Sequence, residues 1–145
     1  MEKERERAAE MNYPSPIQDT KADSDRDYDA AVQLCFDSRD RVAVCVGSHN
    51  DKSNLLLATL MSENNIDPKD SRFWFAQLYG MSDHISYNLA SAGYNVAKYV
   101  PYGPVKEVLP YLIRRAEENT SASGQTGREL GLIMQEMKRR KGSLS

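Results

Sequence analysis

The chain has 145 residues, of which 40% are hydrophobic and 28% are charged, and these values are typical of a soluble globular protein rather than a disordered tail. Its formal net charge of -2 argues against a nucleic-acid-binding protein, because such a protein needs a broad basic surface. No apolar run approaches the ~20 residues that span a bilayer. The charged residues 1–7 also lack the apolar core of a signal peptide, so any membrane contact is expected to be peripheral.

The two cysteines, Cys35 and Cys45, lie in apolar surroundings. They lack the CxxC or Cys/His spacing of a zinc site, and a disulfide framework needs more cysteines than these. We therefore predict no metal site, and a reduced, intracellular compartment is the simpler interpretation.

The first forty residues predict two helices. Residues 1–10 are charged and helix-favouring, and the segment Tyr13-Pro14-Ser15-Pro16 ends this helix in a loop. Residues 23–36 then carry apolar side chains at helical spacing, which predicts a second, amphipathic helix.

Three strand-helix units follow along the chain. Strands are predicted at residues 41–47, 73–78 and 96–100, and helices at residues 51–64, at residues 82–92 and from Gly103-Pro104 onward. The first strand is an almost unbroken valine-rich run, which is typical of a strand buried on both faces. Because parallel strands need crossover helices, the order predicts a parallel α/β fold. Three strands leave two unpaired edges, so we expect the chain to be part of a larger fold.

Each predicted strand ends in residues suited to ligand contacts, and parallel α/β folds bind ligands at the carboxyl ends of their strands. The three segments are Ser48-His49-Asn50, Gln77-Leu78-Tyr79-Gly80 and residues 99–103. Taken alone, His49 is more often a structural hydrogen-bonding residue than a ligand-binding one. Its place at a strand end favours a cofactor contact.

The helix that follows the third strand has two distinct faces. An apolar stripe of Val105, Val108, Leu109, Leu112 and Ala116 is expected to be buried against a core. A neighbouring face carries Tyr111, Arg114, Arg115 and Glu118 at helical spacing. Adjacent guanidinium groups beside a tyrosine favour a carboxylate clamp, although such a face taken alone is more often a solvated surface.

A last amphipathic helix is predicted to end at the basic cluster Lys138-Arg139-Arg140-Lys141. Cations at the end of a helix complement its dipole, so a solvated helix end is the simpler interpretation. An acidic partner or a lipid surface is the alternative.

Three segments resemble, in order and spacing, the carboxyl-terminal part of the proline dehydrogenase family. They are residues 75–83, residues 98–104, and residues 111–115 with Glu118-Asn119. The resemblance extends from Met1 to about Lys141 and implies a partial (β/α)8 (TIM-like) barrel, made of about the last three β/α units plus a C-terminal helix. In this reading residues 1–145 are the carboxyl-terminal portion of the catalytic domain, and the N-terminal half of the barrel is absent.

The resemblance also implies an activity and site residues. The family consists of flavoenzymes that oxidise L-proline to 1-pyrroline-5-carboxylate and pass the electrons from FAD to a membrane quinone. Arg114 and Arg115 resemble the residues that bind the proline carboxylate, Tyr99 and Tyr111 those that pack over its ring, and Leu78 the apolar contact that completes the pocket. The implied FAD contacts are Thr20, Lys21, Ser48, His49, Asn50, Gln77 and Glu118. No catalytic nucleophile is expected, because the flavin carries the hydride chemistry.

A complete (β/α)8 barrel needs about 250 residues. We therefore expect the isolated chain not to oxidise proline, because half of the flavin surface is missing. The alternative is a non-catalytic α/β fragment or binding module that keeps the carboxylate clamp and acts together with another chain. A barrel enzyme that binds phosphate at Gly103-Pro104 is disfavoured, because that helix start lacks a glycine-rich approach.

The expected location is intracellular, either cytoplasmic or mitochondrial, at the periphery of an inner membrane. The sequence indicates neither an oligomeric state nor a preference between proline and hydroxyproline.

Overall fold

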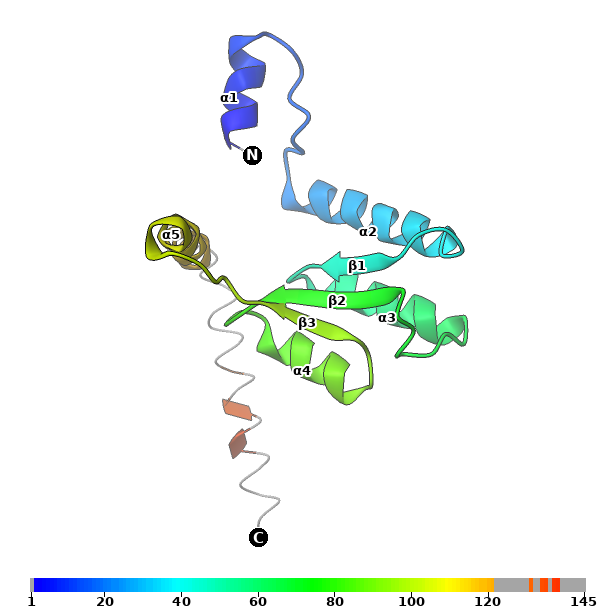
Figure 1. Cartoon of the computed structure of the whole chain (residues 1–145). Coiled ribbons are helices and arrows are strands. Elements are labelled where there is room, and N and C mark those ends of the chain that lie inside the picture. Colours follow the sequence, from blue (N-terminus) through cyan, green and yellow to red (C-terminus); the bar gives the residue numbers. More distant parts are fainter. Residues whose placement is uncertain (1, 122–130, 132–133, 136, 139–145) are drawn as a thin grey trace.

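The structure, a computed structural model, describes residues 2–121, 131, 134–135 and 137–138. Its elements are α1 (Glu2–Glu10), α2 (Lys21–Asp37), β1 (Val44–Gly47), α3 (Asp51–Glu63), β2 (Phe73–Leu78), α4 (Asp83–Ser91), β3 (Val96–Tyr99) and α5 (Val105–Ser121). The three strands form one parallel sheet in the order β1-β2-β3 (Figure 1). The predicted parallel α/β order is therefore confirmed. The basic cluster at the end of the expected last helix lies largely outside the described residues.

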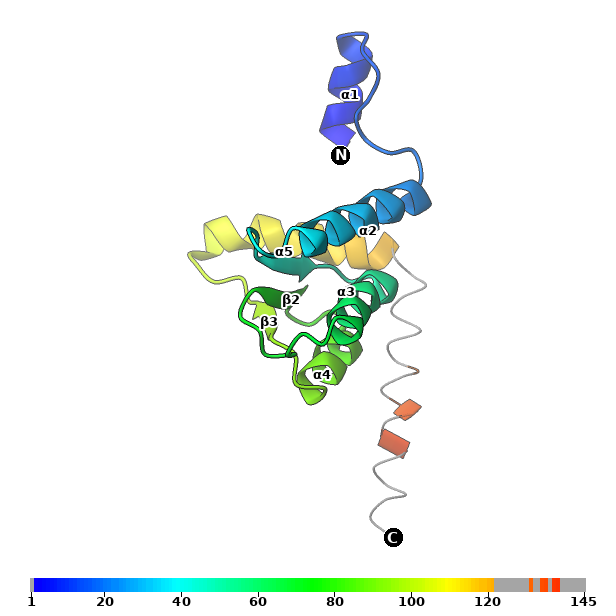
Figure 2. The same ribbon diagram turned by 90° about the vertical axis from the view of Figure 1, so that its right-hand side faces the viewer.

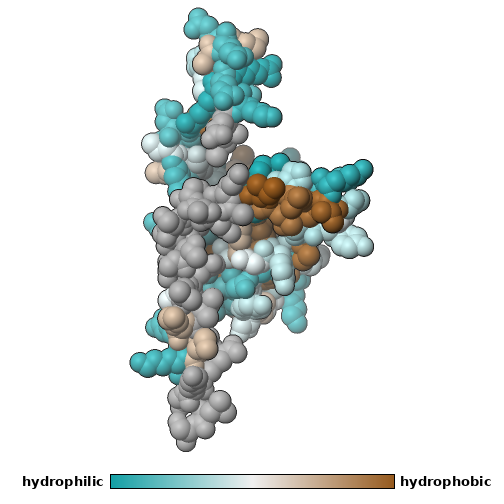
Figure 3. Space-filling model, turned by 90° about the vertical axis from the view of Figure 1, so that its left-hand side faces the viewer, coloured by the Kyte–Doolittle hydropathy of each residue, from teal (hydrophilic) through white to brown (hydrophobic). Residues whose placement is uncertain are grey.

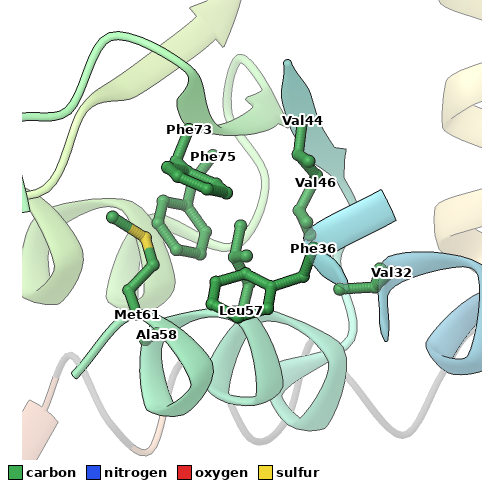
Figure 4. Packing of buried hydrophobic residues seen from close by; sticks show 9 residues of the cluster. All are labelled: Val32, Phe36, Val44, Val46, Leu57, Ala58, Met61, Phe73 and Phe75. Atoms are coloured by element: carbon green, nitrogen blue, oxygen red, sulfur yellow. The ribbon is translucent and has the colours of Figure 1, made fainter. Parts of the chain in front are cut away.

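The hydrophobic core lies on one face of the sheet. Alternate residues of β1 and β2 point into it and meet side chains of α2 and α3, as Figure 4 shows. The buried cluster consists of Val32, Phe36, Val44, Val46, Leu57, Ala58, Met61, Phe73 and Phe75. The rings of Phe36 and Phe73 lie 5.7 Å apart between centroids, which joins α2 to the central strand.

The opposite face of the sheet is open. This open face comprises Cys45, Trp74, Ala76, Leu78, Ala97 and Tyr99, which the alternation of side chains and the strand register place together. Cys45 is exposed, and Trp74 and Tyr99 are 41% and 55% exposed. The prediction that the first strand is buried on both faces is wrong, because the helices packed on β1 cover only the face of Val44 and Val46.

Helix α5 lies beyond the carboxyl ends of the strands and runs across them (Figures 1 and 2). The prediction that its apolar stripe is buried is wrong for this chain, because Val105, Leu109 and Leu112 are 45–76% exposed. Figure 3 shows apolar side chains of this helix on the surface. The physical reason is that α5 lies beyond the carboxyl ends of the strands, away from the core that α2 and α3 form with the sheet. No helix in the described part of the chain is long and apolar enough to cross a membrane.

The loop before β2 is held by one carboxylate. Asp70 accepts hydrogen bonds from the backbone N–H of Arg72 at 2.9 Å and from its Nε and Nη2 at 3.0 and 2.6 Å. The Arg72 side chain, helped by the backbone N–H, lowers the pKa of Asp70 to about 2.

We expect Asp70→Asn to decrease the stability of the fold modestly at pH 7. Because the folded-state pKa is lowered, the contribution of the carboxylate is full above the ordinary aspartate pKa of about 4 and is lost as the pH falls towards about 2. Urea unfolding of both proteins between pH 7 and pH 2 should show midpoints that differ and then converge. Asp40→Asn, at a looser exposed ion pair of 3.6 Å with Arg41, is the control. A difference between wild type and Asp70→Asn that persists at pH 2 would contradict the assignment.

Candidate functional site

The parallel order brings three polar or aromatic segments to one edge of the sheet. We call this edge the rim and define it by Ser48-His49-Asn50 after β1, Leu78 to Ser82 at the end of β2, and Tyr99 at the end of β3. α5 crosses the same edge (Figure 1). The predicted convergence of these segments is therefore a consequence of the sheet topology.

The segment after β1 is held by hydrogen bonds within the chain. Asn54, on the first turn of α3 and 2% exposed, donates from Nδ2 to the carbonyls of Ser48 at 3.0 Å and Asn50 at 2.8 Å. Asn50 caps α3 by accepting from the N–H of Lys52 at 2.9 Å, and its own N–H donates to Ser48 Oγ at 3.0 Å. The loop that carries His49 is thus fixed before any ligand arrives.

Gln77 supports this loop from the core side of the sheet. Its side chain is 2% exposed and donates from Nε2 to Ser48 O at 3.3 Å and to Asn54 Oδ1 at 3.2 Å. Its Oε1 accepts from Ser86 Oγ at 2.9 Å. A direct flavin contact through this amide would require these bonds to be given up, because Gln77 lies on the core face with Phe73 and Phe75, opposite the open face.

Two histidine contacts join the loop after β1 and the first residue of α3 to the start of α4. His49 Nδ1 lies 2.9 Å from Ser82 Oγ, and His84 Nε2 lies 2.8 Å from Asp51 Oδ1. Neither Ser82 nor Asp51 was predicted, because each lies 33 residues from its histidine and no local pattern links them.

The third strand is tied to the same region by Lys98. Its Nζ donates to Met81 O at 2.6 Å and to Asp83 Oδ1 at 2.8 Å. Lys98 alternates with Tyr99, so this contact lies on the face opposite the tyrosine. The loops after β1 and β2 and the end of β3 therefore form one connected polar network.

The predicted substrate residues meet where β3 faces α5. Leu78 and Tyr99 are register partners on neighbouring strands. The rings of Tyr99 and Tyr111 lie 5.8 Å apart between centroids in an edge-to-face arrangement, and Arg115 Cζ lies 5.4 Å from the centroid of the Tyr111 ring. The structure thus brings an apolar side chain, two aromatic rings and a guanidinium group together.

The remaining predicted site residues on α5 are described in part. Arg114 is exposed and lies one helical turn after Tyr111, as its spacing predicted. Glu118 belongs to α5, but its side chain lies outside the described residues.

The first turn of α2 approaches the rim from the other side. Thr20 caps this helix, with its Oγ accepting from the N–H of Asp23 at 3.1 Å, and Lys21 forms an exposed ion pair with Asp25. Lys21, followed by Asn50, lowers the pKa of the Asp25 carboxyl, which places this turn beside the loop after β1. Helix amino termini are suited to anionic groups, and in this structure the carboxylates of Asp23 and Asp25 bind Thr20 and Lys21 at the start of the helix.

These features define a parallel α/β protein with a polar rim at the carboxyl ends of its strands and an arginine-tyrosine face beside it. The profile of the family described as "Proline dehydrogenase" matches residues 1–128. The chain belongs to the proline dehydrogenase family.

Individual relatives agree with this family. "Proline dehydrogenase 1, mitochondrial" of Caenorhabditis elegans is 42% identical over 145 residues, which cover 97% of this chain and 24% of the relative. "Hydroxyproline dehydrogenase" of Xenopus laevis is 42% identical over 144 residues, which cover 97% of this chain and 31% of the relative. The chain spans about a quarter of the length of the mitochondrial relatives, 24% and 23% for those of Caenorhabditis elegans and Homo sapiens.

A solved structure also has a similar fold. The crystal structure of proline utilization A (PutA) from Bdellovibrio bacteriovorus, inactivated by N-propargylglycine, superposes with a TM-score of 0.74 and 27% identity. The match covers 83% of this chain and 12% of that protein.

Proposed function

We propose that this chain is the carboxyl-terminal portion of a proline dehydrogenase barrel and serves the FAD-dependent oxidation of L-proline to 1-pyrroline-5-carboxylate. The observation that carries the proposal is the contact of Tyr99, Tyr111 and Arg115 beside Leu78 at the rim. In this proposal residues 1–145 supply about the last three β/α units of a (β/α)8 fold.

The residues of α5 would orient the substrate. The guanidinium groups of Arg114 and Arg115 suit the two oxygens of a carboxylate, and Tyr99 and Tyr111 offer flat apolar surfaces to a saturated ring. Leu78 would close the pocket from the sheet side and help to exclude water. Such positioning supplies the reacting geometry without a side-chain nucleophile.

The donor groups at the rim fit a flavin dinucleotide. Ser48, His49 and Asn50 offer a hydroxyl, an imidazole and an amide in a loop that is already held by Asn54. Thr20 and Lys21 at the start of α2, together with Glu118, would complete the contacts. When bound, the FAD supplies the hydride acceptor. Gln77 contributes by holding the Ser48 segment from behind.

We propose a membrane quinone as the electron acceptor and a location at the periphery of an inner membrane. Two relatives that support a mitochondrial location carry the name "Proline dehydrogenase 1, mitochondrial". The hydroxyproline dehydrogenase relative makes hydroxyproline a substrate to compare with proline in every assay.

The isolated 145-residue chain is expected to show no proline oxidation. Side chains of the open face and of α5 beside the rim are exposed to solvent in this chain. A hydride transfer site needs a closed pocket that excludes water. Purified chain mixed with FAD, L-proline and a redox dye, with D-proline as the control, measures this directly. Dye reduction that depends on L-proline would show that the chain is sufficient and overturn the expectation.

A non-catalytic binding module is the second candidate. The exposed side chains Val105, Leu109 and Leu112 form apolar surface on the helix that carries the clamp, as expected of a chain that works against a partner. Two measurements together distinguish the candidates. Calorimetric titration of the chain with L-proline measures binding, and an assay of the chain joined to the preceding part of a relative's barrel measures turnover. Turnover in the joined protein supports the enzyme, whereas proline binding without turnover supports the module.

A further inference from the structure

Ser82 has an unusual conformation for the residue that precedes a helix. It has φ 51° and ψ 43°, in the left-handed region, and its side chain makes no capping hydrogen bond to α4. Serine at this position ordinarily caps the helix with its hydroxyl. Here the hydroxyl lies 2.9 Å from His49 Nδ1 instead. A positive φ at a serine costs free energy and persists only where the surroundings enforce it.

The surroundings of Ser82 hold it firmly. Ser82 is 7% exposed, and its carbonyl accepts from the N–H and the Oγ of Ser86 at 3.2 and 3.3 Å. Ser86 Oγ in turn donates to Gln77 Oε1 at 2.9 Å in the central strand. The hydroxyl that meets His49 is therefore anchored to β2 and α4 rather than to a mobile loop.

A fixed hydroxyl at Nδ1 has a definite effect on an imidazole. It sets the plane of the ring, and a hydroxyl whose own direction is held selects the matching state of Nδ1: held as a donor it requires a bare nitrogen, and held as an acceptor it requires an N–H. The state of one ring nitrogen determines what the other nitrogen offers to a ligand.

We propose that Ser82 is a positioning residue that fixes the ring orientation and the tautomer of His49, so that His49 offers the same ring nitrogen to the cofactor in every molecule. The proposal rests on the proposed function only in naming FAD as the group that His49 meets. It assigns to Ser82 a role that neither the sequence motifs nor the resemblance gave it.

The test uses the full chain, which contains only two histidines, His49 and His84. Long-range ¹H–¹⁵N correlation spectra of ¹⁵N-labelled protein report the tautomer of each ring, and His84 serves as the internal reference. Ser82→Gly removes the hydroxyl and also relieves the positive φ. Asn65→Gly, at another positive φ of 54°, is the matched control for the backbone effect.

In the wild-type chain we expect one tautomer of His49 to dominate. In Ser82→Gly its ratio should shift by about fivefold, the factor that a typical intramolecular hydrogen bond contributes. The His84 signals should stay unchanged, and Asn65→Gly should leave both rings unchanged. An unchanged His49 ratio in folded Ser82→Gly would overturn the proposal.

A second variant covers a failure to fold. Ser82→Asn keeps a polar side chain at a position where asparagine tolerates the left-handed conformation, and it should hold His49 in one dominant tautomer. If Ser82→Gly unfolds although its backbone strain is relieved, the serine hydroxyl supports the fold as a whole and the positioning role is refuted.

Addition of FAD to the wild-type chain separates this inference from the proposed function. A change in the His49 signals on addition of FAD, with His84 unchanged, supports the cofactor contact. Unchanged His49 signals refute that contact but leave the effect of Ser82 on His49 as measured.

Discussion

Replacing Phe75 with alanine should destabilise the fold by about 3–5 kcal/mol. Phe75 is fully buried at the centre of the core, and its ring meets the ring of Tyr94 edge to face at 5.4 Å between centroids. Removal of the ring loses both the burial of its apolar surface and the contacts of the side chains around it. Domains have a total stability of about 5–15 kcal/mol, so this single change should leave a large fraction of the protein unfolded. Urea unfolding followed by far-ultraviolet circular dichroism measures the loss.

Trp74→Ala is the matched control for this prediction. Trp74 is the neighbouring residue of the same strand, but it lies on the open face and is 41% exposed. Its removal should cost much less than the removal of Phe75, because the tryptophan is only partly buried. An equal loss of stability in the two variants would contradict the prediction, because it would mean that the open face is packed as tightly as the core face.

The elements of the fold could be predicted because their signals are local. The spacing of apolar residues placed β2 at residues 73–78, where the structure has it, and gave α3 and β3 to within one residue at one end of each. Which faces are buried could not be predicted in the same way. Val44 and Val46 face the core and Cys45 does not, because burial depends on which helices pack on the strand.

Helix α5 illustrates the same limit. Its apolar stripe is a real sequence feature, but whether Leu109 or Leu112 is buried depends on the elements around the helix, and helical spacing carries no information about them. The spacing did predict that Tyr111 and Arg115 share a face, and the structure places the guanidinium near the ring.

The polar network at the rim was the least predictable part of the site. The contacts of His49 with Ser82, of His84 with Asp51 and of Lys98 with Asp83 join residues on different elements. One signal was nevertheless present. Gln77 follows Phe73 and Phe75 with a period of two, which places its amide on the core face, where a buried polar side chain must find hydrogen-bond partners.

Replacement of Arg114 or Arg115 by lysine should weaken the use of proline by about 10- to 100-fold, measured as an increase in KM. The prediction applies to a complete barrel, obtained by joining this whole chain to the preceding part of the Caenorhabditis elegans relative, to which the chain is 42% identical. A lysine keeps the positive charge, but it cannot form two parallel hydrogen bonds to a carboxylate. Steady-state oxidation of L-proline with a dye acceptor gives KM and kcat separately.

The two arginines should differ in a way that their surroundings determine. Arg115 is partly buried and lies near the Tyr111 ring. Arg115→Lys therefore loses the contact of the guanidinium plane with the ring in addition to the paired hydrogen bonds to the carboxylate, and it should have the larger effect. Lys106→Arg, the reverse exchange at an exposed position of the same helix, should leave both KM and kcat unchanged. If all three variants had the KM and kcat of the wild type, a positive charge near the rim would be sufficient for proline binding, and the carboxylate clamp would be refuted. An increase in KM in Arg114→Lys and Arg115→Lys alone would show that proline binding needs the planar guanidinium groups on this face of the helix.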